Sequence, residues 1–173
     1  MSTRSFIAVQ RDDGVYEGIY CHLDGYLTHN GAMLLDHYKD RNKLDRLIAL
    51  GNISELAPKV EPDPNFEHSF DYGKRQEGVV IAYGRDRGEQ GQESKKYSLS
   101  KLLDRTDVNY IYVLDDTDKW IYVKTPAREF KDVKTDLNKE YKSMKIKRPK
   151  GYYGFWTPDR IKEEMKRQKQ EEM

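Results

Sequence analysis

The fold is decided by three consecutive segments near the N-terminus, Ser5–Gln10 (SFIAVQ), Arg11–Gly14 (RDDG) and Val15–Cys21 (VYEGIYC). The first and the third are rich in β-branched and aromatic residues, which favour strands. An Asp-Gly pair between two such segments is a strong signal for a tight turn that joins antiparallel strands. We therefore predict that the chain begins with a β-hairpin.

The elements expected after this hairpin complete an α+β fold. Apolar residues recur at helical spacing over residues 30–38 and 41–50, and Gly51 stands where a helix commonly ends. Residues 57–71 contain several prolines and are expected to form an extended connection, whereas the apolar residues 78–83 predict a central strand. A short helix over 98–103, which the Ser98 side chain could cap, and a second hairpin from 109–114 and 119–123 follow. We predict a mostly antiparallel sheet with helices packed on one face.

The domain organisation is predicted from where this pattern weakens. Residues 1–125 are expected to form the α+β core domain, and residues 126–173 a basic and aromatic helical C-terminal extension with helices over 127–144 and 159–173. The last of these helices is highly charged and has few apolar anchors. It is therefore expected either to fray or to become ordered only when a partner binds.

Composition excludes several classes of protein. The 173 residues include 31 Lys and Arg against 30 Asp and Glu, so no global charge attracts the chain to nucleic acid or to an anionic membrane. The single cysteine, Cys21, excludes an internal disulfide framework and a Cys-rich zinc site, which is typical of a reducing compartment. Neither a secretory signal nor an apolar stretch of the ~20 residues that span a bilayer is present. We expect a cytoplasmic protein with no membrane partner.

The densest polar segment, residues 20–26, follows the second arm of the hairpin and contains His22, Asp24 and Tyr26. Alternate residues of a strand share a face, so the Asp24 carboxylate could orient and charge-stabilise the His22 imidazole. These three residues are therefore candidates for binding a ligand, and His22 with Asp24 is the candidate catalytic pair. The structural alternative is a turn at Asp24 with His22 bonded to the backbone.

A second candidate segment, residues 83–89, follows the apolar run and places Arg85 and Arg87 between two glycines. Guanidinium groups bind phosphate or carboxylate in bidentate fashion, and glycine lets a ligand approach the backbone. The alternative is a salt-bridged turn. The segment matches neither a Walker loop nor a dinucleotide-binding pattern, and the histidine spacings match no metal motif, so we predict no cofactor and no metal site.

The third candidate is the basic and aromatic segment 131–156. It lies mostly within residues 118–150, which carry eleven Lys and Arg against five Asp and Glu. Phosphates are attracted by such charge, and bases stack on aromatic rings. The alternative is a solvated helix followed by aromatic residues folded onto the core. The candidate nucleic-acid contacts are Lys142, Lys145, Lys147, Arg148, Tyr152 and Trp156.

Several motifs resemble an uncharacterised family of small proteins from tailed phages and prophages: residues 2–5 (STRS), 19–26 (IYCHLDGY), Gly31, 34–35 (LL) and 83–89 (YGRDRGE). The resemblance covers about the first two-thirds of the chain. In the commoner form of the pattern, Trp replaces Leu23 and Val replaces Asn30. The resemblance implies no established activity, but it implies a phage setting, in which small accessory proteins act on host enzymes, nucleic acids or defence systems.

Three functional hypotheses follow. The preferred one is a non-enzymatic accessory protein, for example an inhibitor of a host enzyme or defence system, that binds a host protein or an anionic, nucleotide-like small molecule through His22, Asp24, Tyr26, Arg85 and Arg87. The second is an enzyme acting on a phosphoester or nucleotide, with His22 as acid or base and Asp24 as its orienting group. The third is a nucleic-acid-binding protein that uses residues 131–156. The first two require His22 and the two arginines to share a pocket.

Overall fold

Strand β1 (Ser5–Gln10) lies at the centre of the sheet in the computed structural model, which describes residues 2–173. Its residues from Ser5 to Val9 are buried, because the strand is covered on both faces. It pairs antiparallel with β2 (Tyr16–Leu23), so the predicted hairpin is confirmed. Gly14 in the connecting turn has a φ of 78°, a conformation that glycine adopts without strain.

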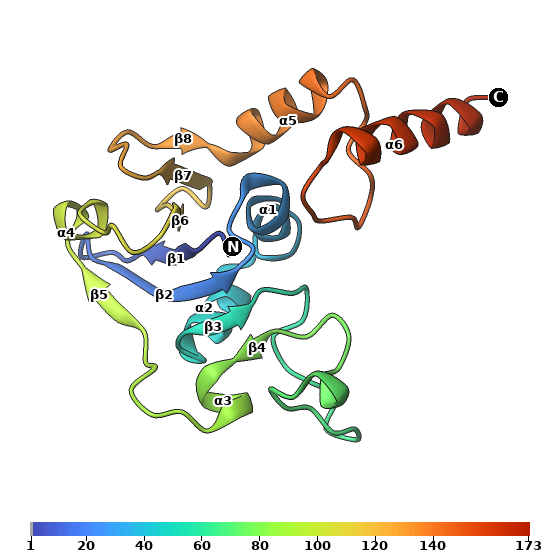
Figure 1. Cartoon of the computed structure of the whole chain (residues 1–173). Helices are drawn as coiled ribbons and strands as arrows, with labels where there is room; N and C mark the ends of the chain where they lie inside the picture. Colours follow the sequence, from blue (N-terminus) through green and yellow to red (C-terminus); the bar gives the residue numbers. More distant parts are fainter. Residues whose placement is uncertain (1) are drawn as a thin grey trace.

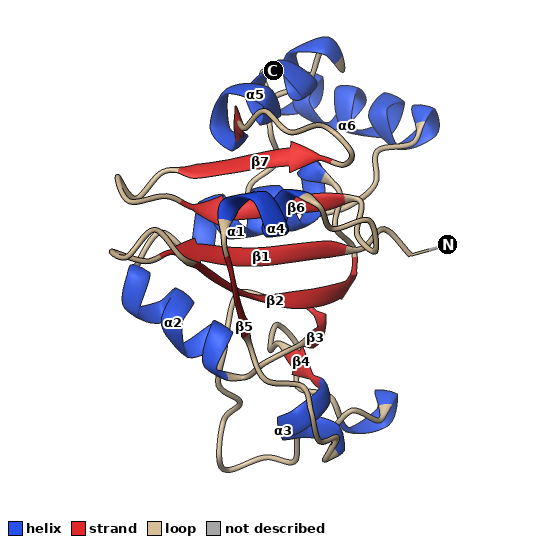
Figure 2. Ribbon diagram, turned by 90° about the vertical axis from the view of Figure 1, so that its left-hand side faces the viewer, coloured by secondary structure: helices blue, strands red, loops and turns tan. Residues whose placement is uncertain are grey.

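The sheet has the strand order β4-β3-β2-β1-β6-β7-β8, with β5 paired beside β2 (Figure 2). Among the strands of the described residues, only β1 with β6 and β2 with β3 pair in parallel, and the other five pairings are antiparallel; an isolated parallel bridge also joins Lys59 and Val79. The predicted α+β fold with a mostly antiparallel sheet is confirmed. The remaining strands are β3 (Ile53–Glu55), β4 (Ile81–Ala82), β5 (Lys95–Tyr97), β6 (Tyr110–Leu114), β7 (Trp120–Lys124) and β8 (Lys131–Asp132).

Helices α1 (Ala32–His37), α2 (Arg41–Ala49) and α5 (Val133–Ser143) contribute to the larger apolar cluster, on one face of the sheet. A π-helical turn, Leu27–Gly31, leads into α1. The Asp40 side chain accepts a hydrogen bond from the Asn42 N–H and so caps α2. The expected helices over 30–38 and 41–50 are therefore present, the first one starting as a π turn.

The opposite face of the sheet is covered by a smaller apolar cluster. Helix α4 (Leu99–Leu103) begins at Ser98, whose hydroxyl accepts from the Lys101 N–H, as the sequence predicts. Leu102 of this helix packs with Phe6, Ala8 and Val113 in a second apolar cluster. The helices thus lie mainly, but not entirely, on one face.

The prediction of a central strand over residues 78–83 is wrong in both the length and the position of the strand. Only Ile81 and Ala82 form β4, which lies at the end of the strand order, and Tyr83 already begins helix α3 (Tyr83–Arg87). The apolar character of this segment reflects burial of Val79 and Val80 against the rest of the chain rather than a long strand ladder. A 3-10 turn, Tyr72–Lys74, lies within the connection that precedes it.

The C-terminal third consists of β8, α5 and helix α6 (Pro158–Glu171). Residues 131 and 132 form β8 where the sequence predicted helix, and Val133, Leu137 and Tyr141 of α5 join the main core. Helix α6 contains no buried residue, and Figure 1 shows it extending away from the sheet toward the C-terminus. None of the helices in residues 2–173 combines the length and the apolar composition that a membrane span requires.

Candidate functional site

His22 lies near the end of β2, where the strand leaves the sheet. Its Nδ1 atom lies 3.0 Å from the Tyr20 hydroxyl, which is two residues earlier on the same face. Within residues 2–173, no hydrogen bond joins His22 to Asp24, so Tyr20 and not Asp24 orients the imidazole. Tyr26 packs edge-on between His29 and Phe155, and burial raises the pKa of its hydroxyl to about 12.

Arg85 is held by acceptors within the protein. Its Nη1 and Nη2 atoms donate to the carbonyl oxygens of Val60 and Val80 at 2.5 and 2.7 Å, and its Nε atom donates to Asp86 at 2.9 Å. All three nitrogens of the guanidinium group therefore bond internally. The arginine ties α3 to the chain that precedes β4, and it has little capacity left for an external oxyanion.

The Asp86 carboxylate links Arg85 to a buried histidine. The side chains of Asp86 and His68 are each only 2% exposed, and the Asp86 Oδ2 atom lies 3.4 Å from His68 Nε2. The Gln76 N–H donates to His68 Nδ1, so the ring proton is on Nε2, on the side of Asp86. Asp86 also accepts from the Ala82 N–H at 2.7 Å. The arrangement is a closed structural network that fastens residues 60–80 to α3.

Arg87 lies beside this network. Its guanidinium carbon lies 4.8 Å from the centre of the Phe70 ring. Together with Ser69, Phe70, Asp71 and Asp86 it lines an open hollow of about 380 Å³. In the described part of the chain no hydrogen bond or ion pair connects Arg85 or Arg87 to His22.

The contacts of His22 and Arg85 are with other residues of the protein. Among the described residues, no hydrogen bond or ion pair joins an arginine to His22, and the joint pocket for His22, Arg85 and Arg87 stays a prediction. Among residues 2–173, no group of three or more His, Cys, Asp or Glu side chains is placed to hold a metal ion.

Helix α5 and the turn that follows it carry both acidic and basic side chains. Asp136 accepts a hydrogen bond from the Tyr122 hydroxyl at 2.8 Å, so this acid faces the sheet. Glu140 is exposed, and its charge contributes to the raised pKa values of Tyr110 on β6 and Tyr122 on β7. Lysines occupy the exposed side. We define the lysine stripe as Lys134, Lys139, Lys142, Lys145 and Lys147, all of which are exposed and, within residues 2–173, have no ion-pair partner.

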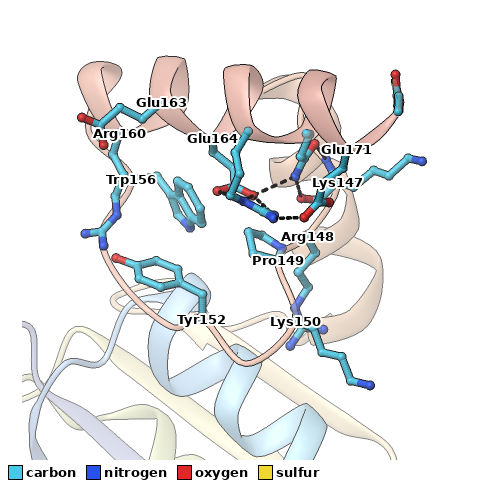
Figure 3. A pocket seen from close by; sticks show the side chains of 13 residues that line it. Lys147, Arg148, Pro149, Lys150, Tyr152, Trp156, Arg160, Glu163, Glu164 and Glu171 are labelled. Carbon is cyan, nitrogen blue, oxygen red and sulfur yellow. Dashed lines mark hydrogen bonds and ion pairs between the residues drawn. The ribbon is translucent and has the colours of Figure 1, made fainter.

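The lysine stripe ends at an open hollow of about 900 Å³ between residues 147–156 and helix α6, which we call the cradle (Figure 3). Figure 3 shows Tyr152 and Trp156 on one side of it and Pro149 with Lys150 on the other. The ring centres of Tyr152 and Trp156 are 5.0 Å apart, edge to face, and the Arg160 guanidinium lies 4.2 Å from the centre of the Tyr152 ring. Aromatic faces and cations thus meet in one concave site.

The predicted nucleic-acid residues have different roles in this region. Lys147 and the aromatic pair Tyr152 and Trp156 line the cradle, whereas Lys142 and Lys145 belong to the stripe beside it. Arg148 also lines the cradle, but its guanidinium pairs with Asp36 on α1. The Trp156 indole N–H donates to the Tyr141 hydroxyl, so this ring also anchors the loop to α5.

Helix α6 supplies cradle residues that the sequence analysis missed. Arg160, Glu164 and Arg167 follow one another at intervals of four and three residues, and Gln168 lies four residues after Glu164, a spacing that would have predicted a common helix face. Arg167 pairs with Glu164 and Glu171, which offsets part of the acidic charge in the site. In total, five basic and four acidic residues line the cradle, so the attraction for an anion comes mainly from the stripe.

A smaller cavity of about 490 Å³ adjoins the cradle through the shared residues 148–150. There the His37 Nε2 atom lies 2.7 Å from the Tyr153 hydroxyl, which donates to Asp36 at 3.1 Å. Burial lowers the pKa of His37, and burial together with Asp36 raises that of Tyr153 to about 12. The cluster fixes the loop of the cradle onto α1.

Comparison of the chain with protein-family models, with curated proteins and with solved structures finds no match.

Proposed function

We propose that this chain is a non-enzymatic binding protein that holds single-stranded nucleic acid along the lysine stripe and against the aromatic side of the cradle. The observation that carries the proposal is the distribution of charge on α5 and the turn that follows it, where Asp136 bonds to Tyr122 of the sheet and the lysines of the stripe are exposed and, among the described residues, have no ion-pair partner. Residues 131–150 contain eight Lys and Arg against three Asp and Glu. A local field of this kind attracts phosphates even though the whole chain has a net charge of only +1.

Single strands are favoured over duplexes by the position of the aromatic residues. Tyr152 and Trp156 lie inside a concave site, where a base can reach them only after leaving a stack. Base stacking on an aromatic side chain is worth about 1–3 kcal/mol and tolerates different bases. The expected ligand is therefore a strand with unpaired bases and no strict sequence.

The implied phage setting is compatible with such a ligand. An accessory protein that covers single-stranded nucleic acid would withhold it from host enzymes, which is one form of the inhibitor expected from the sequence pattern. Both the setting and the host target stay predictions.

The direct test is fluorescence anisotropy with a labelled thymidine oligonucleotide at several salt concentrations. Each phosphate contact contributes about −0.7 to the slope of log affinity against log salt for a single strand. We expect a negative slope, which becomes shallower by about 2 in Lys139→Glu/Lys142→Glu/Lys145→Glu. The matched control is Lys95→Glu/Lys96→Glu/Lys101→Glu, which changes the net charge equally at exposed lysines of β5 and α4.

The aromatic contribution is tested separately with Tyr152→Leu. Loss of one stacked base is expected to weaken single-strand affinity by about 5- to 150-fold and to leave duplex affinity nearly unchanged. Equal losses in the stripe variant and its control, or affinity that does not depend on salt, would refute the proposal.

A further inference from the structure

Residues 61–77, which we call the aromatic loop, are ordered by their own side chains. The Gln76 amide accepts from the Asp63 N–H at 2.7 Å and donates to the carbonyl oxygens of Asp63 and Phe66 at 2.9 and 3.0 Å. His68 anchors the loop from beneath through the buried contact with Asp86. A surface segment held in this way presents its outer side chains without a large entropic cost on binding.

Two of these outer side chains are large aromatic rings in solvent. Phe66 is 70% exposed and Tyr72 is 82% exposed. The Arg75 guanidinium lies 4.0 Å from the centre of the Tyr72 ring, which orients that side chain. Tyrosine and arginine are enriched among residues that dominate binding energy at protein interfaces. A rigid loop with exposed rings is therefore suited to docking on another protein surface.

The charge of the loop indicates the kind of surface that it fits. Residues 61–77 contain five Asp and Glu against two Lys and Arg. Asp71 and Glu77 are exposed and, within residues 2–173, have no ion-pair partner. The complementary surface is basic, and the lysine stripe is such a surface on the same chain.

The two surfaces cannot meet within one molecule. The aromatic loop precedes β4 at one end of the strand order, and the lysine stripe follows β8 at the other. Figures 1 and 2 place α3 and α5, the helices beside them, at opposite ends of the molecule. Charge complementarity between them can therefore be satisfied only between two copies.

We propose that the aromatic loop of one copy docks on the lysine stripe of a second copy, which gives a head-to-tail assembly. Such a contact joins two different patches, so it leaves one free loop and one free stripe at the ends of an open chain, or closes into a ring. The stripe is also the surface assigned above to nucleic acid. A strand bound there competes with the loop, and the assembly dissociates when the ligand is present.

Sedimentation velocity of the full chain tests this inference without any nucleic acid. We expect concentration-dependent association at 50 mM salt and monomers at 500 mM salt, since the contact is electrostatic. The loop variant is Asp71→Asn/Tyr72→Ser, and the stripe variant is Lys139→Gln/Lys142→Gln. All four residues are exposed, so neither variant is expected to alter folding, and each is expected to weaken self-association by about tenfold or more.

Mixing the two variants gives the decisive result. The stripe variant retains an intact loop and the loop variant retains an intact stripe, so a 1:1 mixture is expected to form a dimer that grows no further. A wild-type chain that stays monomeric at low salt, or variants that associate as strongly as the wild type, would overturn the inference. No oligonucleotide is used in this experiment, so a negative result overturns the self-association alone. The proposed nucleic-acid binding is tested separately by the anisotropy measurement.

Discussion

The replacement Asp86→Ala tests whether the buried network is what holds the aromatic loop to α3. The change removes the carboxylate that accepts from Arg85 at 2.9 Å and from the Ala82 N–H at 2.7 Å. It also removes the only carboxylate within salt-bridge distance of His68 among the described residues. Arg85 would keep its two carbonyl acceptors but lose its counter-charge.

The expected loss of stability follows from the burial of the pair. The Asp86 side chain is 2% exposed and that of Arg85 is 24% exposed. Removal of one partner from a buried ion pair costs about 3–5 kcal/mol, because the remaining charge is left without compensation. For a chain of this size, 1 kcal/mol corresponds to about 2–4 °C, so Tm is expected to fall by about 6–20 °C. Asp86→Asn keeps an acceptor for the Ala82 N–H and is expected to lose less.

Urea unfolding followed by tryptophan fluorescence measures this loss as a shift of the midpoint at constant slope. Hydrogen exchange should show the greatest loss of protection in residues 59–80, which the network fastens. The control is Asp12→Ala, at an exposed carboxylate with no side-chain bond among the described residues, and its effect is expected to stay within about 0.5 kcal/mol. A loss below about 1 kcal/mol for Asp86→Ala would refute the structural role of the network.

Three further predictions concern side chains that are buried or half-buried. Burial raises the pKa of Cys21 to about 12, so the native thiol is expected to resist thiol reagents at pH 8 and to react only as fast as the protein unfolds. Stoichiometric labelling of the native protein within minutes would contradict this prediction. Tyr112→Phe removes a buried hydroxyl donor and is expected to cost about 1–3 kcal/mol in urea unfolding, whereas Tyr110→Phe, whose hydroxyl makes no hydrogen bond within residues 2–173, is expected to cost less. Burial and the charge of Lys43 lower the pKa of His37 in the folded protein. The stabilisation that the neutral His37 side chain provides is therefore complete above its usual pKa of 6.5, and it is lost as the pH falls through the lower pKa of the folded state. The stability difference between pH 7 and pH 5 is therefore expected to shrink in His37→Gln, and an unchanged difference would argue against this assignment.

The elements that sequence predicted best are those specified by local chemistry. The Asp-Gly turn set the first hairpin, and the capping residue Ser98 marked the start of α4. Helix α2 ended as expected before Gly51, whose φ of 77° glycine accommodates without strain. Each of these signals acts within a few residues, so no knowledge of the tertiary structure was needed.

The elements that sequence predicted poorly depend on distant contacts. Residues 78–83 resembled a central strand because they are apolar, but their burial comes from packing against residues far away in the chain. The role of Arg85 was equally hidden, since its acceptors include the carbonyl of Val60, 25 residues earlier. An arginine between glycines predicts an anion site and a structural clamp equally well, and only the position of its acceptors distinguishes the two.

The motifs on which the phage resemblance rests have internal roles in this fold. A Cβ atom at Gly25 would lie 2.9 Å from the carbonyl oxygens of Thr3 and Arg4, so glycine is needed where these segments cross. Ser5 accepts a hydrogen bond from the buried Asn30 amide at 3.0 Å.

Arg85 of the YGRDRGE segment also has an internal role, because its guanidinium group bonds to the carbonyl oxygens of Val60 and Val80 and to the buried Asp86. Side chains already bonded inside the protein have little capacity for a ligand, and a scaffold requires them whatever the ligand is. The lysine stripe, whose cations are exposed and have no ion-pair partner among the described residues, lies in the C-terminal third of the chain, outside the motifs that carry the resemblance. Recognition is therefore expected to change with this third of the chain, while the motifs preserve the sheet that supports it.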